Sequence, residues 1–287
     1  MTKRTVANNF LYYIFCGFSG AVTSLIVWLF LKLMGLGIGL VWDTIPSNFD
    51  FKFYPIIVCT AGGIILGIWQ KLTNAVPDEL DEVMKKVKKD KFYPYKVLLL
   101  CISALLPLVF GGSLGPEAGL TGVIVGLCYW AGSHMKDAKS KIPELMQIGI
   151  SATLSAVFYA PLFGLASVNE ERLDSEEKPT DIRSTKLISN IIAVLFAAGT
   201  LFLLNSVFGG SMGLPRLGGY NITNFERLWG IPLALLGAVC GFLFIISSKI
   251  FGKFFALIQG KLGIIISTTL GGIILGVMGT YLPLTMF

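Results

Sequence analysis

The sequence predicts an all-α membrane protein whose chain crosses the bilayer several times. Of its 287 residues, 54% are hydrophobic and 14% are charged, whereas a soluble domain carries roughly 25% charged residues. The mean hydropathy is +0.74, and apolar blocks recur along the whole chain with only short polar connections between them. Such a chain has too little polar surface to cover itself, so lipid must cover it. We therefore expect one transmembrane domain over residues 1–287, with the lipid bilayer as its first partner.

The net charge of +6 has a simple explanation in this setting. Lysines and arginines gather in the polar connections, as they do in cytoplasmic loops under the positive-inside rule. No basic face with interleaved aromatic residues is present, so we expect no nucleic-acid partner. The single histidine, His134, stands in a polar loop, and the cysteines are far apart within apolar stretches. This pattern supports neither a metal site nor a redox motif, and we expect no cofactor.

The first half of the chain begins with two predicted spans. Residues 10–36 form an apolar block longer than the roughly 20 residues that a transmembrane helix needs, and residues 53–69 form a shorter one. The basic and most polar stretch, residues 71–96, follows. With the basic N-terminus inside, two crossings return this stretch to the inside. Residues 77–89 read as a helix, because acidic residues open it and lysines close it.

Two interruptions follow within hydrophobic sequence. Residues 97–110 are apolar until the Gly-Gly-Ser-Leu-Gly-Pro stretch at 111–116, after which an apolar helix is expected over 117–130. Residues 142–158 are apolar until Tyr159-Ala160-Pro161, and a short helix is expected from 162 toward 171. Irregular backbone at membrane depth is tolerated only where it is buried or lines a watery cavity. In transporters such breaks point to the substrate site.

Three longer apolar stretches complete the chain after a charged loop at residues 170–183. They cover residues 186–208, 229–251 and 262–286, and a glycine-rich connection separates the first two. The last one runs to the end of the sequence without a polar tail. We therefore expect that the chain is a truncated form.

The first interruption has the chemistry of an anion site. Its glycines let backbone amides approach a ligand, and Pro116 suits the first position of a helix. Free N–H groups and the positive end of the helix dipole at such a start attract anions. Alternatively, the segment is a helix cap whose glycines allow close packing. The candidate residues are Gly112, Ser113, Leu114, Gly115, Pro116 and Glu117.

Two segments carry a resemblance to a known family. The glycine, two variable residues, Gly-Pro and apolar helix at 112–130 resemble the Gly-x-Glu-Gly-Pro motif of the CLC family of chloride channels and transporters. Residues 158–164, Phe-Tyr-Ala-Pro-Leu-Phe-Gly, with the later pair Glu170 and Glu171, are similar to that family's Phe-Asn-Ala-Pro-Leu-Ala-Gly segment and its acidic pair. The resemblance implies a bundle of tilted and discontinuous helices built from two inverted repeats. It also implies a homodimer that moves small inorganic anions, chloride foremost.

The resemblance assigns roles to single residues. Asn74 takes the place of a chloride-binding serine in the family's Gly-Ser-Gly-Ile-Pro segment, and its amide can donate a hydrogen bond to an anion. Leu114 stands where the family has a gating glutamate, and leucine carries no proton, which favours a passive channel over chloride/proton exchange. Glu117 is the nearest carboxylate. It either approaches the pathway, because helical side chains point back toward the helix start, or only stabilises the helix dipole.

The acidic pair also has two interpretations. Glu171 aligns with the internal glutamate that passes protons in exchanger members, with Glu170 beside it. Alternatively, both are acidic residues where a helix meets water. The matched motifs place residues 10–205 in the first repeat and residues 225–287 at the beginning of a truncated second repeat.

Three functions are compatible with these observations: an anion channel or exchanger, a non-conducting membrane scaffold with the same fold, and an intramembrane enzyme that uses Glu117, Glu170 and Glu171. The sequence offers an enzyme neither a nucleophile nor a metal cluster, so we expect no enzymatic activity. The sequence does not distinguish chloride, fluoride and nitrate as the transported ion.

Overall fold

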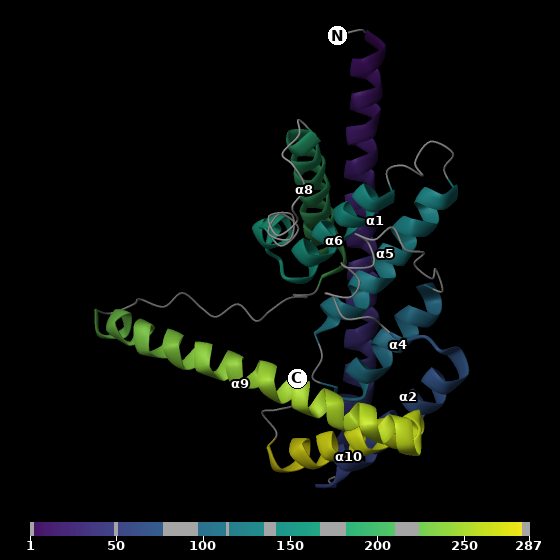
Figure 1. Ribbon diagram of the computed structural model, residues 1–287, viewed down its shortest axis with the longest axis vertical. Coiled ribbons are helices and arrows are strands. Elements are labelled where there is room, and N and C mark those ends of the chain that lie inside the picture. The colour runs from purple at the N-terminus through teal and green to yellow at the C-terminus, as the bar shows by residue number, and fades with distance from the viewer. Residues whose placement is uncertain are drawn as a thin grey trace.

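The computed structural model describes residues 3–48, 51–76, 97–112, 115–134, 142–166, 182–209 and 224–282. Across these residues every regular element is a helix (Figure 1). Within these described residues, five helices are long and apolar enough to cross a membrane. The chain is therefore an all-α, multi-pass integral membrane protein, as the sequence predicts.

The first two predicted spans correspond to α1, Lys3–Ile38, and α2, Tyr54–Thr73. They are joined by a π-helical turn, Gly39–Thr44, and a 3-10 turn, Pro46–Asn48. Aromatic side chains hold this connection against α2. The Trp42 and Tyr54 rings contact each other edge to face with their centroids 6.1 Å apart, and the Tyr54 hydroxyl donates to the Val41 carbonyl at 2.5 Å. The predicted helix over residues 77–89 lies outside the described residues.

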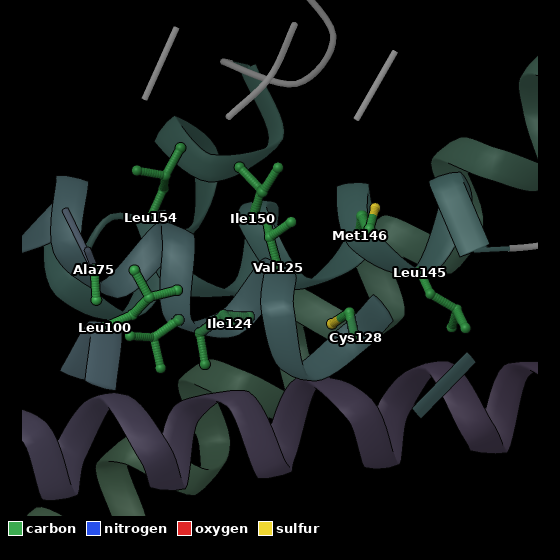
Figure 2. Close-up of a cluster of buried hydrophobic side chains, with 10 residues drawn as sticks. Ala75, Leu100, Ile124, Val125, Cys128, Leu145, Met146, Ile150 and Leu154 are labelled. Carbon is green, nitrogen blue, oxygen red and sulfur yellow. The ribbon is translucent and has the colours of Figure 1, made fainter. Parts of the chain in front are cut away.

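The centre of the bundle is formed by shorter helices packed against α1. They are α4, Val97–Val109, α5, Pro116–His134, and α6, Ile142–Val157. Apolar side chains from α4, α5 and α6, together with Ala75, form a buried cluster, which Figure 2 shows beside the long helix α1. The longer helix α8, Ile182–Phe208, packs against α1 and α6.

One sequence expectation about α5 is wrong. His134 was expected in a polar loop, but α5 continues to this residue. Trp130 is followed by Ala, Gly and Ser, which a helix tolerates, and no proline interrupts the chain between Pro116 and Pro143.

The last two predicted spans correspond to α9, Asn224–Leu262, and α10, Ile264–Tyr281. Gly263, with φ 88°, makes the turn between them, a conformation that glycine adopts without steric cost. In Figure 1, the first part of α9 extends away from the other helices while its end lies at α10, and the residues of its apolar span, Leu228–Gly260, are almost all exposed. The described residues therefore leave this span without a protein cover.

α10 lies against α2 along a line of glycines. A Cβ atom on Gly276 would come within 2.6 Å of the Ile56 Cα, and one on Gly67 within 2.7 Å of the Ile265 Cα. Small residues let the backbones of two membrane helices approach closely, which is how helices gain packing energy in lipid. The parts of the chain predicted as separate repeats are thus packed together through α2 and α10.

Candidate anion site

The predicted interruption between α4 and α5 is present. α4 ends at Val109, and the chain then closes a tight turn in which the Gly112 N–H donates to the Pro107 carbonyl at 2.7 Å. Gly111 adopts φ 87°, which permits this turn. A Cβ on Gly112 would lie 2.7 Å from the Pro107 carbonyl oxygen, so glycine is required there. Ser113 and Leu114 lie outside the described residues.

The chain resumes at Gly115, and α5 begins at Pro116. The first N–H groups of a helix have no partner within the helix. The carboxylate of Glu117 lies back against Gly115, in the position that a Cβ at residue 115 would take. Glu117 therefore points toward the start of the helix, where the dipole favours negative charge.

The interruption packs against α2 and against the connection between α1 and α2. Trp42 donates its indole N–H to the Val109 carbonyl at 2.9 Å, and Phe110 contacts Gly62. Gly62 is close to the middle of α2, and a helix of 20 residues covers about 30 Å at 1.5 Å per residue. The interruption therefore lies beside the middle of a candidate span, where irregular backbone is tolerated only if it is buried in protein or lines a watery cavity.

The end of α2 is fixed to α4 by a buried serine. The Ser103 hydroxyl accepts a hydrogen bond from the Trp69 indole at 2.9 Å and lies 2.7 Å from the carbonyl of Ala75, to which it can donate. Asn74, just before Ala75, ends α2 in the left-handed conformation, φ 49°, and its backbone N–H bonds to the Gln70 carbonyl. Only the exposed side-chain amide of Asn74 is thus available for an anion.

The structure brings the predicted site residues together only in part. The end of α2 is held at Ser103, and α5 contacts the neighbouring Ala104 through Gly119. Both segments thus meet near the middle of α4. Val109, where the turn to Gly112 begins, lies about 9 Å further along the α4 axis at 1.5 Å per residue. Gly115, Pro116 and Glu117 are consecutive at the start of α5, and Gly119 brings this helix to Ala104, next to the Ser103 that holds the segment after Asn74.

The second predicted interruption follows α6 at residues 158–160. Tyr159 has φ 51°, and the Ala160 N–H donates to the Ser155 carbonyl at 3.1 Å. A short helix, residues 161–166, then folds back on α6, where the Ser151 hydroxyl donates to the Gly164 carbonyl at 2.7 Å. Glu170 and Glu171 lie outside the described residues.

Comparison with known proteins agrees with this pair of interruptions. The family model described as "Voltage gated chloride channel" matches residues 58–287, which include both. The chain belongs to this family of voltage gated chloride channels. It is also 23% identical over 269 residues to the "Putative ion-transport protein YfeO" of Escherichia coli O17:K52:H18 (strain UMN026 / ExPEC). That alignment covers 91% of this chain, and the chain spans 60% of the length of that relative.

Sequence reasoning missed one polar group in this member of the family. Asn205, on α8, donates to the Tyr159 hydroxyl oxygen at 2.7 Å and accepts from the Trp28 indole at 3.1 Å. The available signal was the presence of two asparagines, Asn190 and Asn205, in the predicted apolar span 186–208, since polar side chains inside membranes are costly and often functional. Within the described segments no cluster of His, Cys, Asp and Glu has the arrangement of a metal site.

Proposed function

We propose that the chain transports small inorganic anions, with chloride as the first candidate, along a pathway that passes the start of α5. The observation that carries this proposal is the interrupted helix pair at Val109–Pro116, which lies beside the middle of α2. Unpaired N–H groups at such a start attract an anion, and the attraction is less screened there than in water. Membership of the chloride channel family supports the same proposal.

In this proposal Glu117 is the gate. Its carboxylate lies at Gly115, where the α5 dipole would also hold an anion, so carboxylate and anion compete for one position. Leu114, the residue in the place of the family's gating glutamate, cannot take this role because it carries no charge. Asn74 contributes a side-chain donor further along the route. The proposed transport is passive, because no carboxylate at position 114 couples it to protons.

Replacing Glu117 by glutamine tests the gate. The purified chain is reconstituted in liposomes loaded with chloride, and efflux is followed with a chloride electrode. We expect Glu117→Gln to raise the rate about fivefold, since about 1 kcal/mol of favourable carboxylate–dipole interaction no longer opposes the anion. The control is Asp43→Asn, which neutralises an exposed carboxylate in the turn after α1. Equal rates for wild type and Glu117→Gln would reject the gate, and a folded chain without chloride efflux would favour a scaffold.

Proton movement tests whether transport is passive. Liposomes with an inward chloride gradient and a trapped pH dye should show no proton flux coupled to chloride. Proton flux that follows the chloride gradient would instead indicate exchange, and Glu117, Glu170 and Glu171 would be the groups to replace next.

We also propose the assembly that the family resemblance implies: a homodimer with one pathway in each subunit, and two inverted repeats within the subunit. Light scattering of the detergent-solubilised chain tests this, because a dimer doubles the protein mass within the micelle. A monomer that conducts chloride would exclude the dimer as a requirement.

A further inference from the structure

Polar side chains from three separate elements meet around Tyr159. Trp28 comes from α1, Asn205 from α8, and Tyr159 from the interruption after α6. The Trp28 Nε1 to Asn205 Oδ1 distance is 3.1 Å, and the Asn205 Nδ2 to Tyr159 hydroxyl distance is 2.7 Å. The three residues are far apart in sequence, so the fold itself assembles this group.

The chemistry of the three side chains fixes the direction of the hydrogen bonds. An indole N–H only donates, so the Asn205 atom that faces Trp28 must be the carbonyl oxygen. The amide nitrogen of Asn205 therefore faces Tyr159 and donates to the hydroxyl oxygen. The hydroxyl proton of Tyr159 is left for another acceptor, and none is found among the residues that the structure describes. Donors in such a chain polarise one another, which strengthens the last one.

The backbone conformation at Tyr159 indicates that the fold holds the Tyr159 side chain in this orientation. Tyr159 has φ 51°, a left-handed conformation that costs energy for a bulky side chain. Tyr159 and Asn74 are the non-glycine residues with positive φ in the described part of the chain. The Tyr159 side chain is 37% exposed, so a ligand can reach it. Strained residues of this kind gather at functional sites.

A positive charge stands next to the group. The Lys32 ammonium lies 5.6 Å from the centre of the Trp28 ring and donates to the Gly209 carbonyl at 3.2 Å. Lys32 follows Trp28 by one turn of α1, so both lie on the same face of that helix. It has no carboxylate partner within the described segments, so its charge remains available to attract an anion.

We infer that the Tyr159 hydroxyl, oriented by Asn205 and Trp28 and assisted by Lys32, binds a small inorganic anion at a second site between α1, α8 and the end of α6. The choice of ligand rests on the proposed function, because that function supplies the anion. None of its residues belongs to the start of α5. We expect the ligand to be an anion that only accepts hydrogen bonds, since the site offers it one O–H donor and one cation.

Calorimetric titration of the detergent-solubilised chain with sodium chloride, in a gluconate buffer, tests the site. Tyr159→Phe removes only the hydroxyl, and we expect it to weaken chloride binding at one class of sites about tenfold, the loss typical of one hydrogen bond to a charged group. The matched control is Tyr281→Phe, which removes the hydroxyl of an exposed tyrosine on α10 whose ring faces Lys52. Binding that is equal in wild type and Tyr159→Phe would overturn the inference.

Asn205→Asp tests the direction of the hydrogen bonds from Asn205 to Tyr159 while the Tyr159 side chain is unchanged. A carboxylate can accept hydrogen bonds from both Trp28 and Tyr159. The Tyr159 hydroxyl would then donate to the carboxylate rather than to the anion, and the carboxylate would also repel the anion. We expect a loss at least as large as in Tyr159→Phe, with an unchanged circular dichroism spectrum. Wild-type affinity in Asn205→Asp would overturn the inference.

The two proposals fail separately. Chloride binding that depends on Tyr159, without chloride efflux from liposomes, keeps this site and rejects transport. Efflux with binding that is independent of Tyr159 keeps transport and rejects this site.

Discussion

At the scale of single residues, Ser103 determines how the end of α2 is held. Its side chain is 1% exposed and joins Trp69 of α2, Ala75 after α2, and the carbonyl of Leu99 in its own helix. Buried polar groups stabilise a protein only when they are paired, and each one left unpaired costs free energy. Ser103 therefore holds the segment that carries Asn74 close to α4.

We predict that Ser103→Ala lowers the free energy of unfolding by about 1–2 kcal/mol, because the Trp69 indole and the Ala75 carbonyl lose their partner. Thermal unfolding in detergent, followed by circular dichroism, measures the change. Ser206→Ala is the control, since Ser206 is exposed on α8 and donates only to the Leu203 carbonyl of its own helix. Equal losses in the two variants would contradict the role given to Ser103.

Residue chemistry was predictable from the sequence where it is local. Helical side chains point toward the N-terminal end of their helix, which predicts that Glu117 lies at the start of α5. The structure places it there. The contact of Tyr159 with Asn205 was not predictable, since 46 residues separate them and no local rule links them. The capping of α2 by Asn74 was open to prediction, because asparagine often ends helices in the left-handed conformation.

At the scale of elements, the packing of α2 on α10 depends on glycine. The positions of Gly63, Gly67, Gly272 and Gly276 bring the two backbones into direct contact. In lipid the hydrophobic effect does not hold helices together, so close packing must.

We predict that Gly276→Ala destabilises the protein by about 1–3 kcal/mol, because the added methyl would lie 2.6 Å from the Ile56 Cα and force the helices apart. The control is Gly241→Ala on α9, where no atom lies within 4 Å of the added methyl; this change should stabilise by up to about 1 kcal/mol through helix propensity. Thermal unfolding of both variants decides. A neutral result at Gly276 would mean that α10 moves away from α2 at no cost.

The sequence predicted where helices break but not which helices pair. Glycine and proline mark both interruptions, and α4, α5 and α6 end or begin within a few residues of the expected positions. Pairing was not predictable, because spans that are apolar on every side have no single face that must be buried. α2 and α9 illustrate this, since both are apolar spans, yet α2 packs against α10 along its length while α9 is exposed.

At the scale of the whole molecule, packing and charge give the same topology. α2 and α10 are antiparallel, because Gly67 meets Ile265 while Ile56 meets Gly276. Lys52, before α2, lies over the ring of Tyr281 at the end of α10, at 5.8 Å. The opposite ends therefore share the other side of the membrane, where α2 has Lys71 in its last turn, and the basic sequence of residues 71–96 begins there. Under the positive-inside rule we expect this side to be cytoplasmic.

Cysteine labelling tests this topology in full. In a variant with the exposed Cys240 replaced by alanine, single changes Ser47→Cys, Lys71→Cys and Tyr281→Cys are treated with a membrane-impermeant maleimide in right-side-out vesicles. We expect the first and third to be labelled from outside and Lys71→Cys only after permeabilisation, because α2 carries position 71 across the bilayer. Labelling of all three in detergent is the control for reactivity. Labelling of Lys71→Cys and Tyr281→Cys from the same side would contradict the antiparallel arrangement of α2 and α10, since their packing places these two positions at opposite ends of the pair.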